Sequence, residues 1–318
     1  MTDLALLGDI GGTNSRFGLV KIGSTEVEDV ERLSNNDFAS LEAAIGHYLS
    51  KRGISRLAGA AVDVAAPVDR EVITLTNRDW TFSAESLRKA AHAESFRLLN
   101  DFEALAWSLP HLKPEHLVQI GGTANPKPQM KVVLGPGTGL GMAGLAPLPG
   151  GGWIPIPGEL GHTTLPVVTH EEMALRDSIR GPGKFVEVED ILTGPGLYDL
   201  YKIICKTPKH QTPEQVLQSA LHGGDADAEK TIDHFMTFLS RLAGDAAMAL
   251  QARGGVYLAG GIAPSLAERL KAPKYRAIFE DKGRIAELMR VIPLYVITDP
   301  FPAFKGCAAA LNAHVKRT

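Results

Sequence analysis

Leu6-Leu7-Gly8-Asp9-Ile10-Gly11-Gly12-Thr13-Asn14 is an apolar run that ends in a glycine-rich turn. This pattern indicates a buried strand followed by a turn in which the backbone closely approaches another group. Two later runs end in the same way, Val132-Val133-Leu134-Gly135-Pro136-Gly137-Thr138-Gly139-Leu140-Gly141 and Val256-Tyr257-Leu258-Ala259-Gly260-Gly261-Ile262. Exposed backbone N–H groups in such turns bind anions, so phosphate is the expected ligand.

The order of the three turns is more informative than any single turn, because most glycine-rich turns bind nothing. Together they predict one nucleotide site assembled from three places in the chain. Two common nucleotide motifs are excluded. No lysine follows Gly12 or Gly141 as a P-loop requires, and the first turn lacks the Gly-x-Gly-x-x-Gly spacing of a dinucleotide-binding strand and helix.

Composition predicts an ordinary globular protein with one large or two medium domains. The chain has 318 residues, 44% of them hydrophobic and 22% charged, and a net charge of −3. No segment gathers five or six basic residues, so neither nucleic acid nor an anionic membrane is an expected partner. The first residues show no signal peptide, which predicts a cytoplasmic protein. Cys205 and Cys307 are expected to be buried thiols within helices.

Alternating strand and helix patterns predict an α/β fold. The loop 121–129, rich in glycine, proline, asparagine and threonine, is a plausible entry to a second domain. An apolar stripe on the second long helix is interpreted as core packing and consists of Phe235, Phe238, Leu239, Leu242 and Ala246. Strands are expected at 4–7, 15–20, 57–64, 71–76, 96–99, 131–134 and 291–297, and helices at 41–49, 83–91, 102–109, 197–206, 228–253, 265–270, 280–289 and 304–315.

Two polar pairs are the candidate chemical groups. Asn100 and Asp101 follow an apolar strand, where α/β folds present active groups, but Asn100 with Glu103 also forms a helix-capping pattern. Glu159 and His162 share a glycine-bracketed loop. They are too few for a metal site of their own. A carboxylate and a neutral imidazole can read adjacent sugar hydroxyls, or the pair can merely hold the loop.

Several segments resemble known motifs in the same order. The three turns resemble the phosphate-1, phosphate-2 and adenosine motifs of the sugar kinase and actin-like ATPase superfamily. Leu99-Asn100-Asp101-Phe102-Glu103-Ala104 resembles the catalytic segment of bacterial glucokinases. Pro157-Gly158-Glu159-Leu160-Gly161-His162 resembles their Pro-Gly-Glu-Gly-Gly-His motif, and the segment 188–197 is similar to theirs as well. The chain thus resembles a bacterial glucokinase over nearly its whole length.

The resemblance implies ATP-dependent phosphorylation of glucose at its 6-hydroxyl. Asp101 would take the hydroxyl proton. The sugar-binding residues would be Asn100, Glu159, His162 and Glu189, with Ala66-Pro67 and Thr76-Asn77 lining the sugar side. The nucleotide site would contain Gly8, Asp9, Ile10, Gly11, Gly12, Thr13, Asn14, Gly135, Gly137, Thr138, Gly139, Gly260 and Gly261. Asp9 would orient Mg²⁺ through water, and Arg16 either neutralises charge or is an ordinary strand residue.

Two residues depart from the family pattern. Leu160 replaces a glycine and would be strained if that position needs a positive φ, and Pro136 removes one N–H donor from its turn. No cysteine occurs between Val167 and Arg180, so the zinc site of related sugar kinases and repressors is not expected.

The implied fold has two lobes of ribonuclease H-like mixed sheets flanked by helices, with a cleft between them. The lobes are expected at 1–112 plus 300–318 and at 113–299, and a homodimer is implied. Other hexoses or amino sugars stay open as substrates, as does a sugar sensor on the same fold. A DNA-binding regulator is disfavoured because the first strand begins at Leu4, and a filament ATPase would not need the sugar-binding residues.

Overall fold

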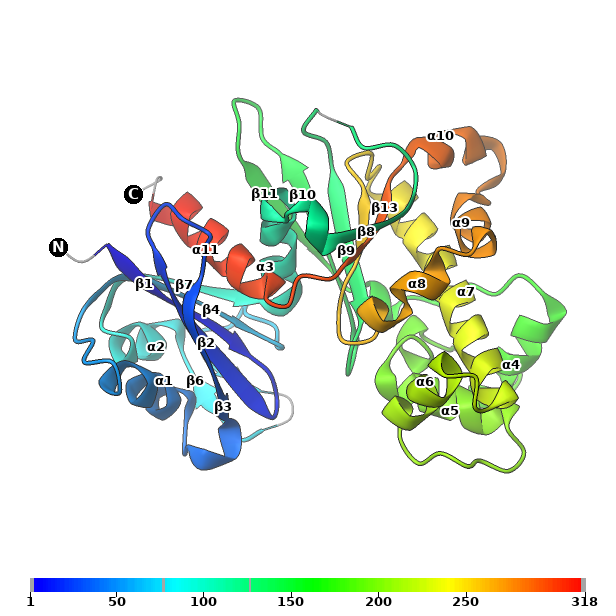
Figure 1. The fold of residues 1–318 in the computed structure, drawn as a ribbon, viewed down its shortest axis with the longest axis horizontal. Helices are drawn as coiled ribbons and strands as arrows, with labels where there is room; N and C mark the ends of the chain where they lie inside the picture. Colours follow the sequence, from blue (N-terminus) through cyan, green and yellow to red (C-terminus); the bar gives the residue numbers. More distant parts are fainter. Residues whose placement is uncertain (1–2, 76–77, 126, 316–318) are drawn as a thin grey trace. The chain divides into compact units, whose positions relative to one another are not determined.

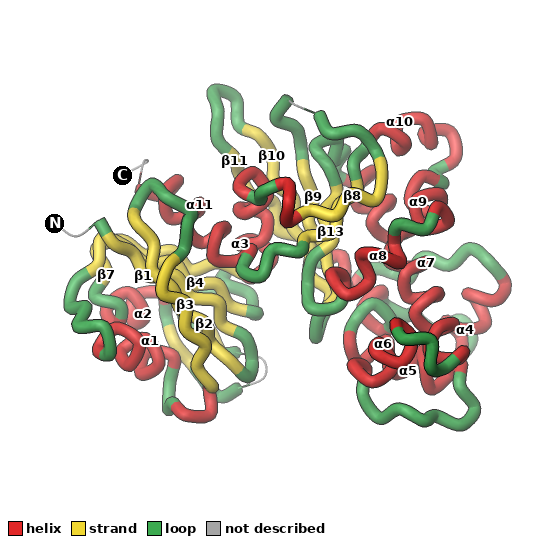
Figure 2. The backbone as a smooth tube through the Cα atoms, viewed as in Figure 1, coloured by secondary structure: helices red, strands yellow, loops and turns green. Residues whose placement is uncertain are grey.

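The structure is a computed structural model that describes residues 3–75, 78–125 and 127–315. The chain divides into two compact units. Unit 1 contains Met1–Pro114, Leu148–Pro155 and Asp299–Thr318, and unit 2 contains Glu115–Pro147 and Ile156–Thr298. Each unit has a mixed sheet with helices packed on it, as Figure 1 and Figure 2 show. The predicted α/β class is confirmed.

Unit 1 is built on a five-stranded sheet in the order β3-β2-β1-β4-β7. Adjacent strands are antiparallel among β1 (Leu4–Ile10), β2 (Asn14–Lys21) and β3 (Glu28–Ser34). The strands β4 (Leu57–Val64) and β7 (Ala93–Asn100) run parallel to β1. This arrangement brings the carboxyl ends of β1, β4 and β7 to one edge of the sheet.

Helices cover both faces of this sheet. Because side chains alternate along a strand, β1 contributes Leu6 to one core and Leu7 to the other. The first core also contains α1 (Leu41–Ser50) and α2 (Ala84–Ala90). The second contains α3 (Asp101–Ser108) and α11 (Pro302–Val315), which Figure 1 shows side by side. The last helix therefore belongs to the same unit as the first strands.

Unit 2 is built on a six-stranded sheet in the order β11-β10-β9-β12-β13-β8. Its strands are β8 (Leu117–Gly121), β9 (Lys131–Pro136), β10 (Leu140–Pro147), β11 (Trp153–Gly158), β12 (Val256–Leu258) and β13 (Leu294–Ile297). Of β11, residues 156–158 are assigned to unit 2 and residues 153–155 to unit 1. The hairpin β9–β10 has β12 as the parallel neighbour of β9. The hairpin β1–β2 has β4 in the same position, so both sheets repeat one strand-turn-strand arrangement.

The longest helix of unit 2 carries the predicted apolar stripe. All five residues of that stripe on α7 are at most 2% exposed, which confirms their role in the core. The helices are α4 (His170–Arg180), α5 (Gly194–Ile204), α6 (Pro213–Leu221), α7 (Ala226–Ala249), α8 (Ala267–Leu270), α9 (Pro273–Glu280) and α10 (Ala286–Val291). No helix in the described ranges combines the length and apolarity that a membrane span needs.

Short elements connect these strands and helices. A two-stranded ribbon consists of β5 (Ile73–Thr74) and β6 (Thr81–Phe82). The 3₁₀ turns are η1 (Asn35–Asp37), η2 (Leu109–His111), η3 (Pro114–His116), η4 (Leu160–His162), η5 (Val188–Asp190), η6 (Ala263–Leu266) and η7 (Gly283–Ile285).

Some predicted boundaries were wrong. The helix expected to reach residue 253 ends at Ala249, because Gln251 has a φ of 48° that a helix cannot continue. The strand expected from residue 291 starts at Leu294, since Val291 ends α10 and Pro293 follows. The helix expected at 280–289 is interrupted between α9 and α10. Cys205 lies just after α5 rather than within a helix, although both cysteines are buried as predicted.

Candidate active site

The first predicted phosphate turn connects β1 to β2 in unit 1. The backbone N–H of Gly11 donates to the carbonyl oxygen of Asn14 at 3.0 Å and closes the turn. Asp9 faces Arg16 across the hairpin, and Arg16 Nη1 donates to Asp9 Oδ2 at 2.8 Å. Arg16 therefore orients the carboxylate that was predicted to orient the metal.

Asn35 supports this turn and was not predicted as a site residue. Its Nδ2 donates to the carbonyl oxygens of Gly11 at 2.8 Å and Gly12 at 3.2 Å, and its Oδ1 accepts from Ser15 Oγ at 2.7 Å. Its backbone N–H donates to the carbonyl oxygen of Thr13 at 2.9 Å. The Asn35 side chain is fully buried. In the sequence, an asparagine between a strand and a helix is indistinguishable from an ordinary turn residue.

Replacing Asn35 by alanine is expected to raise KM for ATP about tenfold, with a smaller effect on KM for glucose. The change leaves Ser15 Oγ and two carbonyl oxygens without their partner, and each such loss costs about 1–3 kcal/mol. Steady-state kinetics with each substrate varied in turn measures this. The matched control is Asn36→Ala, because Asn36 is exposed. Equal KM values for ATP in both variants would contradict the supporting role of Asn35.

Asn100 and Asp101 lie where β7 ends and α3 begins. Asn100 Oδ1 accepts a hydrogen bond from the Phe102 N–H at 2.9 Å, and Asp101 Oδ1 accepts from the same group at 3.0 Å. Asn100 is the helix cap, as predicted, but its bond runs to Phe102 instead of the backbone N–H of residue 103 that a capping box uses. Asn100 Nδ2 donates to the carbonyl oxygen of Ala66 at 3.3 Å, which places the predicted Ala66 beside it.

Burial sets the protonation behaviour of Asp101. It raises the pKa of the carboxyl to about 6, and the nearby charge of Asp9 adds to this effect while the Phe102 N–H opposes it. At pH 7 the group is therefore mostly ionised and is a stronger proton acceptor than an ordinary aspartate. Acceptance of the Phe102 N–H and acceptance of a proton are compatible in this one carboxylate.

Asp63 is a third carboxyl group at this sheet edge and was not predicted. In the β1–β4 register it stands opposite Asp9, and it is 1% exposed. Cys307 Sγ donates to Asp63 Oδ2 at 3.3 Å, whereas Asp63 Oδ1 has no partner within the described residues. Burial and the charges of Asp9 and Asp101 raise the pKa of Asp63 well above its usual range, which favours its neutral form. Its only sequence signal is an acid inside an apolar strand.

The second and third predicted nucleotide turns meet backbone to backbone in unit 2. A Cβ atom on Gly135 would lie 2.2 Å from the carbonyl oxygen of Ala259, and one on Gly260 would lie 2.5 Å from that of Pro136. Gly260 also has a φ of +82°. Any larger residue at either position would push the two turns apart. Gly261, by contrast, has open space beside it, which suits the approach of a ligand.

The Glu189 carboxylate joins the second turn to the predicted sugar segment. Its Oε2 accepts a hydrogen bond from the Leu140 N–H at 2.8 Å. The same oxygen lies 3.1 Å and 2.9 Å from the positions that a Cβ atom would take on Gly139 and Gly161. Gly139 belongs to the predicted nucleotide turn, and Gly161 to the segment with Glu159 and His162. Glu189 thus brings residues of both predicted functions together within unit 2.

Glu159, Leu160 and His162 form the turn around η4. The described residues other than glycine with a positive φ do not include Leu160, so its replacement of a glycine causes no backbone strain. His162 Nδ1 is hydrogen-bonded to Glu187 Oε2 at 2.8 Å, a contact that was not predicted. Asp190 accepts a hydrogen bond from Arg180 at 2.7 Å. Both acidic neighbours of Glu189 therefore have partners of their own, His162 for Glu187 and Arg180 for Asp190.

Comparison with known proteins shows the family of this chain. The family model described as Glucokinase matches residues 6–314. The chain belongs to the glucokinase family. It is 37% identical over 312 residues to the glucokinase of Marinobacter nauticus, covering 97% of each chain. It is 39% identical over 315 residues to that of Chromobacterium violaceum, covering 98% of this chain and 90% of the relative.

A solved structure supports the same assignment. The crystal structure of a glucokinase from an Antarctic psychrotroph matches with a TM-score of 0.88 and 31% sequence identity. The match covers 98% of this chain and 100% of that chain. The expectation of a sugar kinase fold is therefore confirmed for this member of the glucokinase family.

The structure divides the predicted residues between the two units. Unit 1 holds Ala66, Pro67, Asn100, Asp101 and the first turn, and unit 2 holds Glu159, His162, Glu189 and the other two turns. Thr76 and Asn77 lie outside the described residues. That both groups face one cleft between lobes stays a prediction.

Asp9 fits the predicted Mg²⁺ by donor type. Carboxylate oxygens suit this ion, which usually keeps several waters and binds proteins through one or two carboxylates together with substrate phosphates. Within the described ranges, no three His, Cys, Asp or Glu side chains form a group that could hold a metal ion. The ion would therefore depend on the nucleotide for part of its coordination.

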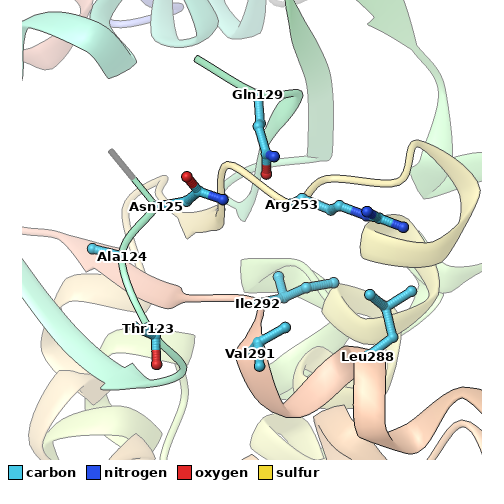
Figure 3. Close-up of a pocket in the computed structure, with 8 residues that line it drawn as sticks. All are labelled: Thr123, Ala124, Asn125, Gln129, Arg253, Leu288, Val291 and Ile292. Carbon is cyan, nitrogen blue, oxygen red and sulfur yellow. The ribbon is translucent and has the colours of Figure 1, made fainter. Parts of the chain in front are cut away.

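A cavity of about 470 Å³ lies in unit 2. Figure 3 shows the residues that line it. It is lined by Thr123, Ala124, Asn125, Gln129, Arg253, Leu288, Val291 and Ile292. Gln129 and Arg253 precede β9 and β12, whereas Gly135 and Gly260 lie at or after the other ends of these parallel strands. The cavity contains none of the predicted site residues and is separate from the glycine turns.

Proposed function

We propose that this chain transfers the γ-phosphoryl group of ATP to the 6-hydroxyl of glucose, giving glucose 6-phosphate and ADP. The match of the glucokinase family model over residues 6–314 supports this reaction. The observation that carries the mechanism is the position of Asp101, a partly buried carboxylate at the end of a parallel strand and the start of a helix. Phosphoryl transfer requires such a group beside the acceptor hydroxyl.

The glycine turns would bind the nucleotide. Backbone N–H groups of Gly12 and Thr13 would contact the terminal phosphates, because the Gly11 N–H already closes the turn on the Asn14 carbonyl, and the turn at Gly137 would contact them from unit 2. The space beside Gly261 would admit the adenosine. When bound, Mg²⁺ supplies neutralisation of the phosphate charge, and Asp9 would hold it through water.

The sugar would be fixed by one amide, two carboxylates and one imidazole. Asn100 has an Nδ2 with a single long bond to the Ala66 carbonyl at 3.3 Å, so it can donate to a hydroxyl as well. Glu159 and Glu189 would accept from hydroxyl groups, and His162 would contact another. Because Glu189 is already held by the Leu140 N–H, sugar binding and the phosphate turn would be coupled through one side chain.

The oxygen of the sugar 6-hydroxyl would bond to the γ-phosphorus while the bond from that phosphorus to the bridging oxygen of ADP breaks. Asp101 would accept the proton that this hydroxyl loses. Because the raised pKa of Asp63 favours its neutral form, Asp63 would add no further negative charge beside Asp101. Closure of the two lobes at 1–112 plus 300–318 and at 113–299 would exclude water, which otherwise competes as acceptor. A homodimer and a cytoplasmic location are further parts of this proposal.

A panel of hexoses tests the proposal. We expect ADP release from ATP and Mg²⁺ to depend on sugar and to be fastest with glucose, compared with mannose, glucosamine and fructose. Side chains that hydrogen-bond sugar hydroxyls from fixed positions bind an analogue more weakly when its hydroxyls leave those side chains without a partner. The readout is a coupled ADP assay at several concentrations of each sugar. ADP release that is independent of sugar would contradict the proposal, and a faster rate with another hexose would correct its substrate.

A further inference from the structure

The contact between His162 and Glu187 is the part of the sugar segment that the proposed function leaves unused. His162 Nδ1 lies 2.8 Å from Glu187 Oε2. The Glu187 side chain is 26% exposed and that of His162 is 59% exposed. One edge of the imidazole is therefore held by a mostly covered carboxylate, while much of the ring stays accessible to a ligand.

The backbone fixes Glu187 in this position. Residues 163–165 pair with residues 186–188 through Leu165 N–H to the Val186 carbonyl at 2.9 Å and Val188 N–H to the Thr163 carbonyl at 3.0 Å. Thr164 and Glu187 form an isolated antiparallel bridge between these bonds. The Glu187 N–H also donates to Asp190 Oδ2 at 2.9 Å. Because the backbone of Glu187 is anchored in this way, only the side-chain torsions have to be fixed when the carboxylate binds the ring.

The contact dictates which nitrogen of the ring carries the proton. An ionised carboxylate can only accept, so Nδ1 must be the donor. In a neutral imidazole the other nitrogen, Nε2, is then an acceptor with a free lone pair. Without such a partner, a ring that is this exposed would exchange between both tautomers, and its Nε2 would be a donor for part of the time.

We propose that Glu187 is a positioning residue that holds His162 in the Nδ1–H tautomer, so that Nε2 accepts a hydrogen bond from a sugar hydroxyl. This inference rests on the proposed function, because it assigns a direction to one of the sugar contacts. Glu187 itself does not touch the sugar. A ring held in this tautomer would accept from a hydroxyl group at Nε2 and would not donate to it.

Protonation of His162 gives the inference a pH dependence. The hydrogen bond to Glu187 is the largest cause that raises the pKa of His162, and the nearby charges of Glu189, Glu187 and Glu159 add to it. Among the described residues, these three glutamates are the charged groups that raise the pKa of the ring. In the cation both nitrogens donate, so Nε2 stops being an acceptor. Affinity for glucose is therefore expected to fall as the pH drops through the raised pKa of His162.

Nitrogen-15 NMR of the histidine side chains tests the tautomer without any sugar. At pH 8.5 the parent is expected to show His162, assigned with the His162→Gln variant, as the Nδ1–H tautomer. Glu187→Gln keeps an oxygen acceptor and should retain this tautomer, whereas Glu187→Ala should shift the ring toward Nε2–H. The exposed carboxylate of Glu214, also in unit 2, gives the control Glu214→Ala, which should change nothing. A His162 in the Nε2–H tautomer in the parent would overturn the inference.

Kinetics then tests the consequence for the sugar. Glu187→Ala is expected to raise KM for glucose about 3- to 10-fold with kcat within about twofold of the parent, as for the loss of one hydrogen bond. Glu187→Gln should restore KM at pH 8.5. If Glu187→Ala shifts the tautomer but leaves KM unchanged, the inference fails. If the parent makes no glucose 6-phosphate, the proposed function fails instead, whatever the tautomer.

Discussion

Replacing Asp101 by asparagine is expected to lower kcat for glucose phosphorylation about 100- to 10,000-fold, the usual contribution of a positioned general base. Asparagine has nearly the same shape and keeps an oxygen that can accept from the Phe102 N–H, so the start of α3 should be preserved. The amide cannot accept the hydroxyl proton. Steady-state kinetics measures the fall in kcat. Calorimetry measures glucose affinity, which should stay within about threefold of the parent.

The pH dependence of the parent provides a second readout of the same carboxyl group. Because the pKa of Asp101 is raised to about 6, the acid form should dominate below that pH and kcat/KM should fall about tenfold per pH unit. The matched control for Asp101→Asn is Glu94→Gln. Glu94 lies on β7, the strand that precedes Asp101, and forms an exposed ion pair with Arg56. An Asp101→Asn variant as active as Glu94→Gln would rule out the assigned role.

Replacing Gly306 by alanine is expected to destabilise unit 1 by about 3 kcal/mol or more, beyond the typical cost of overpacking. A Cβ atom at this position would lie 1.7 Å from the carbonyl oxygen of Ala104, so α11 and α3 would have to separate. We expect a loss of roughly 10 °C in Tm. Since α3 begins at Asp101, kcat should fall as well.

A second glycine gives the control for this change. Gly46 lies within α1, and a Cβ atom added there would have no neighbouring atom within 4 Å, so alanine should stabilise the helix by about 0.5–1 kcal/mol. Differential scanning calorimetry of both variants compares the two sites. A Gly306→Ala protein that melts with the parent would show that the two helices do not depend on this close approach.

The buried parts of the fold were the most predictable from sequence. β4 was predicted with its observed bounds, because it is a continuous apolar run flanked by breaks. Edge strand β3, with the sequence Glu-Asp-Val-Glu-Arg-Leu-Ser, has no apolar pattern because much of it faces water, and it was missed. Helix α4 was also missed, although Thr169 and Glu172 form the capping box that marks its start.

The candidate site was predictable where one local motif carried the signal. The glycine turns, Asn100 and Asp101 each lie within a short recognisable segment. Asn35, Asp63 and Glu187 instead act through contacts with residues 24, 244 and 25 positions away, respectively. No local pattern encodes such pairs, because the approach of two side chains is fixed only when the sheets and turns have packed.

The position of the transferred phosphoryl group tests the central claim most directly. The protein would be incubated with ATP, Mg²⁺ and either glucose or 6-deoxyglucose, and the products followed by phosphorus-31 NMR. The account predicts glucose 6-phosphate with equimolar ADP from glucose, and no sugar phosphate from 6-deoxyglucose, because the hydroxyl that Asp101 would deprotonate is missing. A sugar phosphate from 6-deoxyglucose, or only inorganic phosphate from glucose, would contradict it.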